Sequence, residues 1–163
     1  YSCMSDSLTQ EFSEIQDTIQ GVLERNRLAV LATQRKGQPH TSLIAFTPLE
    51  GLRFIAFATY RSTLKYKSIL EDQRVAILIE DREGDATRHS DQRLVLTALG
   101  EAILMPAEDR QAHLMTHLAR HPNLEEFLSS PDCEFVRVCV HAYQVVSSID
   151  DVRWVRIGKP AVT

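Results

Sequence analysis

The chain has 163 residues, of which 44% are hydrophobic, and a formal net charge of −4 at pH 7. This length and composition fit one folded domain over residues 1–163. The acidic balance argues against a nucleic-acid partner, because no basic stripe is available to neutralise successive phosphates. All apolar runs are far shorter than the roughly 20 residues of a membrane span, so we expect a cytoplasmic protein with no membrane partner. Three residues precede Met4, and we expect residues 1–6 to be disordered or a cloning remnant.

The first half of the chain predicts one helix followed by strands. Apolar residues recur at helical spacing over residues 7–26, which is typical of an amphipathic helix. The period then changes, and apolar runs separated by turn signals predict strands at 28–33, 39–47, 52–58 and 75–79. The last of these runs has no polar residue, which suggests burial on both faces.

The second half predicts three more strands and two helices. Residues 81–92 are polar and highly charged and indicate an exposed loop, and a long strand follows over 93–105, where Gly100 suggests a bulge or a close backbone contact. Further elements are predicted as helices over 106–121 and 124–128 and strands over 133–147 and 152–157. Six or seven strands with an N-terminal helix and further helices at the margins favour a mainly β fold, a closed or split β-barrel.

The most informative stretch runs from Thr59 to Lys65, where the third strand gives way to a helix ending near residue 71. Ser62 or Thr63 can cap that helix, and its free N–H groups favour an anion. Its first turns instead carry cations: Arg61, Lys65 and Lys67. A bound phosphate would neutralise these charges and accept hydrogen bonds from the N–H groups and hydroxyls. The alternative is a solvated helix start with ordinary surface lysines.

Histidines recur four residues apart on the predicted helix over 106–121: His113, His117 and His121. This spacing places them on one face, where they could bind a metal or haem. The HExxH signature is absent, so a solvated or packed helix face is the better explanation, and we predict no metal site. The cysteines are odd in number and include no CxxC pair, and Cys139 fits a packed strand residue rather than a nucleophile.

Three segments together resemble the FMN-binding split barrel family related to pyridoxamine 5'-phosphate oxidase. They are the hairpin Gly37-Gln38-Pro39-His40-Thr41-Ser42, the helix start Thr63-Leu64-Lys65 and the helix end Ile69-Leu70-Glu71-Asp72-Gln73-Arg74-Val75-Ala76. The similarity spans roughly residues 28–102, and order and spacing agree over four elements. Family members usually end this helix with Asn-Pro-Arg-Val, whereas this chain has Asp-Gln-Arg-Val.

The resemblance implies a homodimer with FMN in a groove at the subunit interface. Carried over by position, Thr63 and Lys65 would hold the phosphate, helped by Arg61 and Ser62. The remaining implied cofactor contacts are Thr59 and Tyr60 beside the flavin or its ribityl chain, and Ser42, Leu43 and Ile44 near the ring. FMN would supply the redox chemistry, and no catalytic residue is identified. The sequence does not separate FMN from the deazaflavin cofactor of some relatives, or from haem.

The chain departs from the family at its C-terminal end. Members that oxidise pyridoxine phosphate carry a closely spaced Arg and His there, whereas this chain has Arg153 and Arg156 with no His nearby. We therefore do not expect true pyridoxamine-phosphate oxidase activity.

Trp154 could cover the flavin or lie in the core or a dimer interface. Two hypotheses remain: an FMN-dependent oxidoreductase acting on an unidentified small molecule, or a non-catalytic flavin- or haem-binding protein for storage or sensing.

Overall fold

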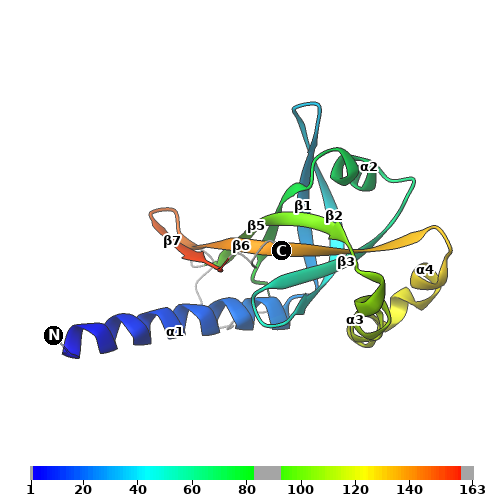
Figure 1. Cartoon of the computed structure of the whole chain (residues 1–163). Coiled ribbons are helices and arrows are strands. Elements are labelled where there is room, and N and C mark those ends of the chain that lie inside the picture. The colour runs from blue at the N-terminus through cyan, green and yellow to red at the C-terminus, as the bar shows by residue number, and fades with distance from the viewer. Residues whose placement is uncertain (1, 83–92, 159–163) are drawn as a thin grey trace.

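Backbone pairing in the computed structural model closes six antiparallel strands into a barrel and adds a seventh strand at its side. Residues 2–82 and 93–158 are described (Figure 1). The strand order is β3-β2-β1-β4-β5-β6-β7, and a β3–β6 pairing closes the ring. The strands are β1 (Leu28–Arg35), β2 (Gln38–Leu49), β3 (Phe54–Tyr60), β4 (Arg74–Glu80), β5 (Val95–Leu104), β6 (Cys133–Ser148) and β7 (Asp151–Arg156). The predicted mainly β split-barrel fold is thereby confirmed.

The helices lie at the margins of the barrel, as predicted. They are α1 (Ser2–Arg25), α2 (Leu64–Glu71), α3 (Ala107–Arg120), the 3-10 turn η1 (Pro122–Leu124) and α4 (Glu125–Ser129). In Figure 1, α1 extends along one side, while α2 and α3 lie on opposite sides of β2 and β3. The first helix begins earlier than the predicted residue 7. Within the described ranges, no helix is long and apolar enough to cross a membrane.

The core is divided between the barrel interior and a smaller cluster outside it. The interior is filled by aliphatic and aromatic side chains from α1, α2 and all seven strands. The outer cluster gathers between α3 and the outer faces of β3 and β6: Leu49, Phe54, Ala56, Met105 and Phe135. Because both clusters use β3, this strand is buried on both faces, which explains its nearly continuous apolar sequence.

Strand β4 is not buried on both faces, so that prediction was wrong. Its burial alternates, and Leu78 is 42% exposed. Leu28, Val30 and Leu43 on the paired strands β1 and β2 are also exposed apolar residues. On one face of β4, the apolar side chains therefore pack in the barrel interior. On the other face they form part of an exposed apolar surface.

The predicted loop over 81–92 begins with a buried residue rather than an exposed one. Asp81 is buried, and its carboxylate pairs with Arg25 at 2.7 Å and accepts a hydrogen bond from the Asn26 amide at 2.8 Å. These contacts tie the end of β4 to the end of α1. Residues 83–92 of the predicted loop lie outside the described residues.

Gly100 marks an irregularity in β5, as predicted. The register between β5 and β6 shifts between Leu99 and Gly100. A Cβ atom at Gly100 would lie 2.3 Å from the backbone oxygen of Cys139, closer than any side-chain carbon can approach. Cys139 itself packs against the outer apolar cluster, which confirms its prediction as a packed strand residue.

Arg120 at the end of α3 fastens α1 to the barrel. Its guanidinium donates hydrogen bonds to the Leu23 carbonyl at 2.8 Å, the Glu24 carbonyl at 3.0 Å and the Phe46 carbonyl at 3.1 Å, and also to the Asn26 carbonyl. Two of these acceptors, the Leu23 and Glu24 carbonyls, belong to the last turn of α1, where carbonyl groups lack partners within the helix, and Asn26 directly follows it. A cation there also complements the helix dipole.

Candidate cofactor-binding site

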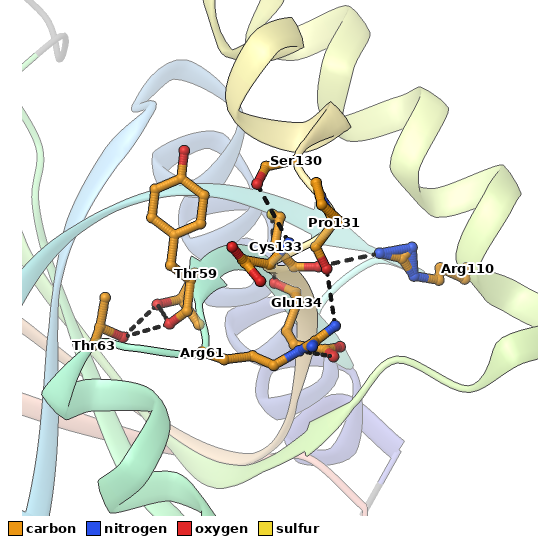
Figure 2. Close-up of polar contacts among 10 residues, drawn as sticks. Thr59, Arg61, Thr63, Arg110, Ser130, Pro131, Cys133 and Glu134 are labelled. Atoms are coloured by element: carbon orange, nitrogen blue, oxygen red, sulfur yellow. Dashed lines mark hydrogen bonds and ion pairs between the residues drawn. The ribbon is translucent and has the colours of Figure 1, made fainter.

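The predicted phosphate corner forms where β3 passes into α2. Thr63 is the N-cap of α2, and its hydroxyl accepts from the Tyr66 N–H at 3.3 Å. That hydroxyl also donates to the Tyr60 carbonyl at 2.9 Å and lies 2.7 Å from the Thr59 hydroxyl (Figure 2). Thr63 is therefore engaged in holding the corner, as expected for an N-cap residue. The cap satisfies one N–H group and leaves others at this helix start without a side-chain partner among the described residues.

Lys65 follows the cap by two residues and is half-buried. Among the described residues, its ammonium makes no hydrogen bond or ion pair. Burial lowers the pKa of this group below its ordinary value, since removal from water disfavours the charged form. An unpaired, partly desolvated cation at a helix start would be stabilised by an anion.

Arg61 points elsewhere. Its guanidinium donates to the Glu134 carboxylate at 2.9 Å and to the Pro131 carbonyl at 2.9 Å, and Figure 2 shows it directed toward the turn before β6. Ser62 is exposed. Arg61 and Ser62 line a neighbouring depression of about 530 Å³ together with Tyr60, Ser130 and Asp132. In this structure Arg61 thus braces the corner, and its charge is already paired.

A cavity of about 230 Å³ opens beside the corner, over the outer faces of β2 and β3. Most of the predicted cofactor residues line it: Leu43, Ile44, Thr59, Tyr60, Thr63 and Lys65. The cavity wall also includes His117, which the sequence offered only as a possible metal or haem ligand, and four residues that it did not single out: Ala45, Ala58, Leu124 and Phe127. Tyr60 and Phe127 pack together with ring centroids 4.4 Å apart. The wall is therefore mostly apolar, with Lys65 and the threonines gathered on the α2 side.

Ser42 does not line this cavity. It pairs with Leu31 across the hairpin and points to the same face as that interior residue. Its hydroxyl oxygen is buried without a hydrogen-bond partner among the described residues, as are the His40 Nδ1 and Thr33 Oγ1 atoms. Ser42 and Leu43 face opposite sides of β2 because side chains alternate along a strand; Ile44 shares the side of Ser42 but lies farther along the strand, where it borders the cavity.

His117 closes the cavity from the α3 side. Its Nδ1 lies 2.7 Å from the Thr47 hydroxyl of β2, and its ring packs against Phe135. Burial, together with the nearby His121 and Arg120, lowers the pKa of His117 to about 4, so the imidazole is neutral at pH 7. The four-residue histidine spacing pointed to one helix face, but only the packing of α3 on β2 distinguishes His117 from a surface histidine.

A second depression, of about 850 Å³, adjoins the first. Leu43 lines both. The exposed apolar residues Leu28, Val30 and Leu78 line the second one. The cavity over β2 and β3 is therefore continuous with the exposed apolar surface of β1, β2 and β4.

A family model described as pyridoxamine 5'-phosphate oxidase matches residues 15–146. The match covers most of the chain, and the protein belongs to this family. It extends well beyond the three segments that suggested the resemblance, through α3 and most of β6. No curated protein matches the chain.

Solved structures share the fold at low sequence identity. A haem-binding protein from Mycobacterium smegmatis superposes with a TM-score of 0.74 and 16% identity, covering 83% of this chain and 55% of that one, so this chain spans about half of its length. General Stress Protein 26 from Bacillus anthracis superposes with a TM-score of 0.67 at 16% identity, and the match covers 88% of this chain and 98% of that one. A FAD-binding protein from Mesorhizobium loti superposes with a TM-score of 0.60 at 13% identity, and the match covers 76% of this chain and 87% of that one. At these identities the likeness shows the fold alone.

Proposed function

We propose that this protein binds FMN in the cavity over β2 and β3 and acts as a flavin-dependent oxidoreductase on a small molecule. The observation that carries the proposal is Lys65, a half-buried and unpaired cation beside the N-cap of α2. A phosphate supplies the missing countercharge and accepts hydrogen bonds from the helix N–H groups. The apolar wall beyond it, including Leu43 and Phe127, suits a planar aromatic ring.

Different residues would contact different parts of this cofactor. Lys65 and the N-terminal N–H groups of α2 would bind the phosphate, while Thr59 and Thr63 hold the corner in shape. The chain from Ala58 to Tyr60 and the outer face of β2 would line the ribityl chain and the ring. FMN supplies the redox chemistry when bound. The protein contributes position, a countercharge and an apolar wall that limits access by water.

The proposed functional unit is a homodimer. The cavity measures about 230 Å³, below the roughly 300–1,000 Å³ usual for pockets that enclose a ligand of this size. One chain would therefore cover only part of FMN. The adjoining apolar surface of β1, β2 and β4 continues into the cavity through Leu43, and such exposed patches mark interaction sites. A second copy seated there would bury Leu28 and Leu78 and complete the wall.

Titration with FMN and with riboflavin tests the cofactor assignment, because the two share the ring and differ in the phosphate. We expect FMN to bind more tightly by at least tenfold, as a charge-assisted phosphate contact requires. Equal affinities would contradict the phosphate site, and failure to bind either would refute the flavin proposal. Oxidation of reduced nicotinamides by the loaded protein, with a panel of small acceptors, then separates an oxidoreductase from a storage or sensing protein.

The second candidate is a haem-binding role without redox turnover. His117 is the residue that motivates it, because its Nε2 atom has no hydrogen-bond partner among the described residues; to bind iron, the ring would have to carry its proton on Nδ1 and donate it to Thr47. The absorption spectrum of the purified and reconstituted protein decides between the candidates. A Soret band that is lost in His117→Phe supports haem, and flavin bands support FMN. A deazaflavin cofactor is distinguished by its own absorption and by mass spectrometry of the released compound.

A further inference from the structure

A second hollow adjoins the cofactor cavity at the corner between β3 and α2. This depression of about 530 Å³ is lined by Tyr60, Arg61, Ser62, Ser130 and Asp132. Tyr60 also lines the cofactor cavity, so the two hollows share one wall. The volume of the depression falls within the roughly 300–1,000 Å³ usual for ligand pockets. A ligand that filled both hollows would pass the start of α2, where the proposed phosphate lies.

The polar groups of this depression are accessible and have hydrogen-bonding capacity to spare. Ser62 and Asp132 are exposed, and their side chains have no partner among the described residues. The Ser130 hydroxyl accepts from the Asp132 N–H at 3.3 Å and donates to no group of the described chain. The Arg61 guanidinium bonds to one carboxylate and one carbonyl near the start of β6 (Figure 2), which uses two of its five N–H groups. The depression therefore offers free donors and one free carboxylate.

We propose that this depression binds the adenosine phosphate half of a flavin dinucleotide, so that the preferred cofactor is FAD rather than FMN. The inference rests on the proposed flavin function, because it needs the FMN moiety in the cavity and its phosphate at the start of α2. The second phosphate would continue toward the Ser62 hydroxyl and the free N–H groups of Arg61. Guanidinium groups suit phosphate because their N–H donors form charge-assisted bonds in a planar fork. The adenosine would then lie beyond the phosphates, in the depression.

Asp132 selects the group that follows the phosphates. A carboxylate accepts hydrogen bonds and donates none, and it would repel a further anion. Ribose hydroxyls are donors, and an acidic side chain that accepts from them is a recurrent feature of dinucleotide sites. The Asp132 carbonyl accepts from the Arg61 backbone N–H at 3.1 Å, so the two residues are held together and would contact adjacent parts of one ligand. The alternative is a solvated hollow whose side chains meet only water.

Parallel titrations with FMN and FAD test the inference. We expect the wild type to bind FAD at least about tenfold more tightly, which is the effect of one hydrogen bond to a charged group. Asp132→Ala should weaken FAD binding by about tenfold or more and leave FMN binding within about twofold. Without a direct contact the effect would have the opposite sign, because loss of a negative charge favours an anionic ligand. Asp17→Ala removes an exposed carboxylate of α1 that lines neither hollow, and this control should change neither affinity.

The outcomes separate this inference from the flavin proposal. Binding of FAD that is equal to or weaker than binding of FMN would overturn the inference and leave the FMN site intact, as would unchanged FAD binding in Asp132→Ala. Failure of the wild type to bind either flavin would remove both proposals. If Asp132→Ala weakened the binding of reduced nicotinamide dinucleotide to the FMN-loaded protein and not that of FAD, the depression would belong to an electron donor, which also overturns the inference. Chromatography of the flavin retained by wild type offered both in equal amounts needs no variant: FAD is expected, and FMN contradicts it.

Discussion

Replacing Lys65 by methionine should weaken FMN binding strongly while leaving riboflavin binding nearly unchanged. Methionine keeps most of the apolar stem that packs in the cavity wall and removes only the charge. Lys65 is half-buried, and burial has already lowered its pKa, so it is less shielded by water than an ordinary surface lysine. A phosphate contact to such a group is charge-assisted and contributes about 1.5–3 kcal/mol. This corresponds to a roughly 13- to 160-fold increase in the Kd for FMN.

Lys67 provides the control for this experiment. It lies on the same helix, carries the same charge and is exposed. Lys67→Met changes the net charge equally, so it reports the long-range attraction of FMN alone. That effect should be less than about threefold and should disappear at high salt, because charges beyond roughly 8–10 Å are screened at physiological ionic strength. Fluorescence quenching on titration of FMN and riboflavin gives both constants.

Equal effects of the two lysine substitutions would refute the reasoning. They would mean that the phosphate senses only the general charge of α2 and does not contact Lys65. A loss of riboflavin binding in Lys65→Met would point instead to a damaged cavity, which the unfolding midpoint of the variant would reveal.

The remaining predictions concern stability. The depressed pKa of His117, about 4 against an ordinary 6.5, means that the unfolded chain binds the extra proton. The contribution of this residue to the free energy of unfolding is therefore complete above pH 6.5 and falls by roughly 3 kcal/mol as the pH drops to 4. Urea unfolding at several pH values should show a correspondingly smaller loss of free energy in His117→Gln. The same pH dependence in the variant and the wild type would contradict the assignment. Gly100→Ala should destabilise by about 2 kcal/mol or more, because its Cβ meets the Cys139 backbone, and a wild-type thermal midpoint would disprove the contact. Arg120→Met should cost about 2–4 kcal/mol, since it strips donors from several carbonyl groups; calorimetry that shows no loss would mean that these bonds contribute little.

Local signals explain why the corner between β3 and α2 could be predicted. Thr63 caps the helix through a bond to a backbone group three residues away, and such motifs depend on nearby sequence alone. The hairpin turns and the glycine irregularity in β5 are recognisable for the same reason. Lys65 was expected at the site because it lies two residues after the cap, in the first turn of the helix.

The rest of the site depends on partners that are distant in the chain. Arg61 had the sequence context of a phosphate ligand, but Glu134, 73 residues away, takes its charge. His117 was indistinguishable from a surface histidine until β2 placed Thr47, 70 residues away, against it. Leu78 belongs to an apolar run that is typical of a doubly buried strand, and only the barrel geometry leaves its outer face exposed.

The length of β6 has a consequence for how this protein acquires its fold. This one strand pairs with β3, β5 and β7, and it joins Phe54 to Cys139, residues from opposite halves of the chain. The ring cannot close before β6 has been synthesised, so β3 keeps an unpaired edge while most of the chain is already outside the ribosome. Such edges pair readily with other chains, and closure over so long a separation is slow. The wall of the cofactor cavity built by β3 would thus be among the last parts to mature, after translation has passed residue 139.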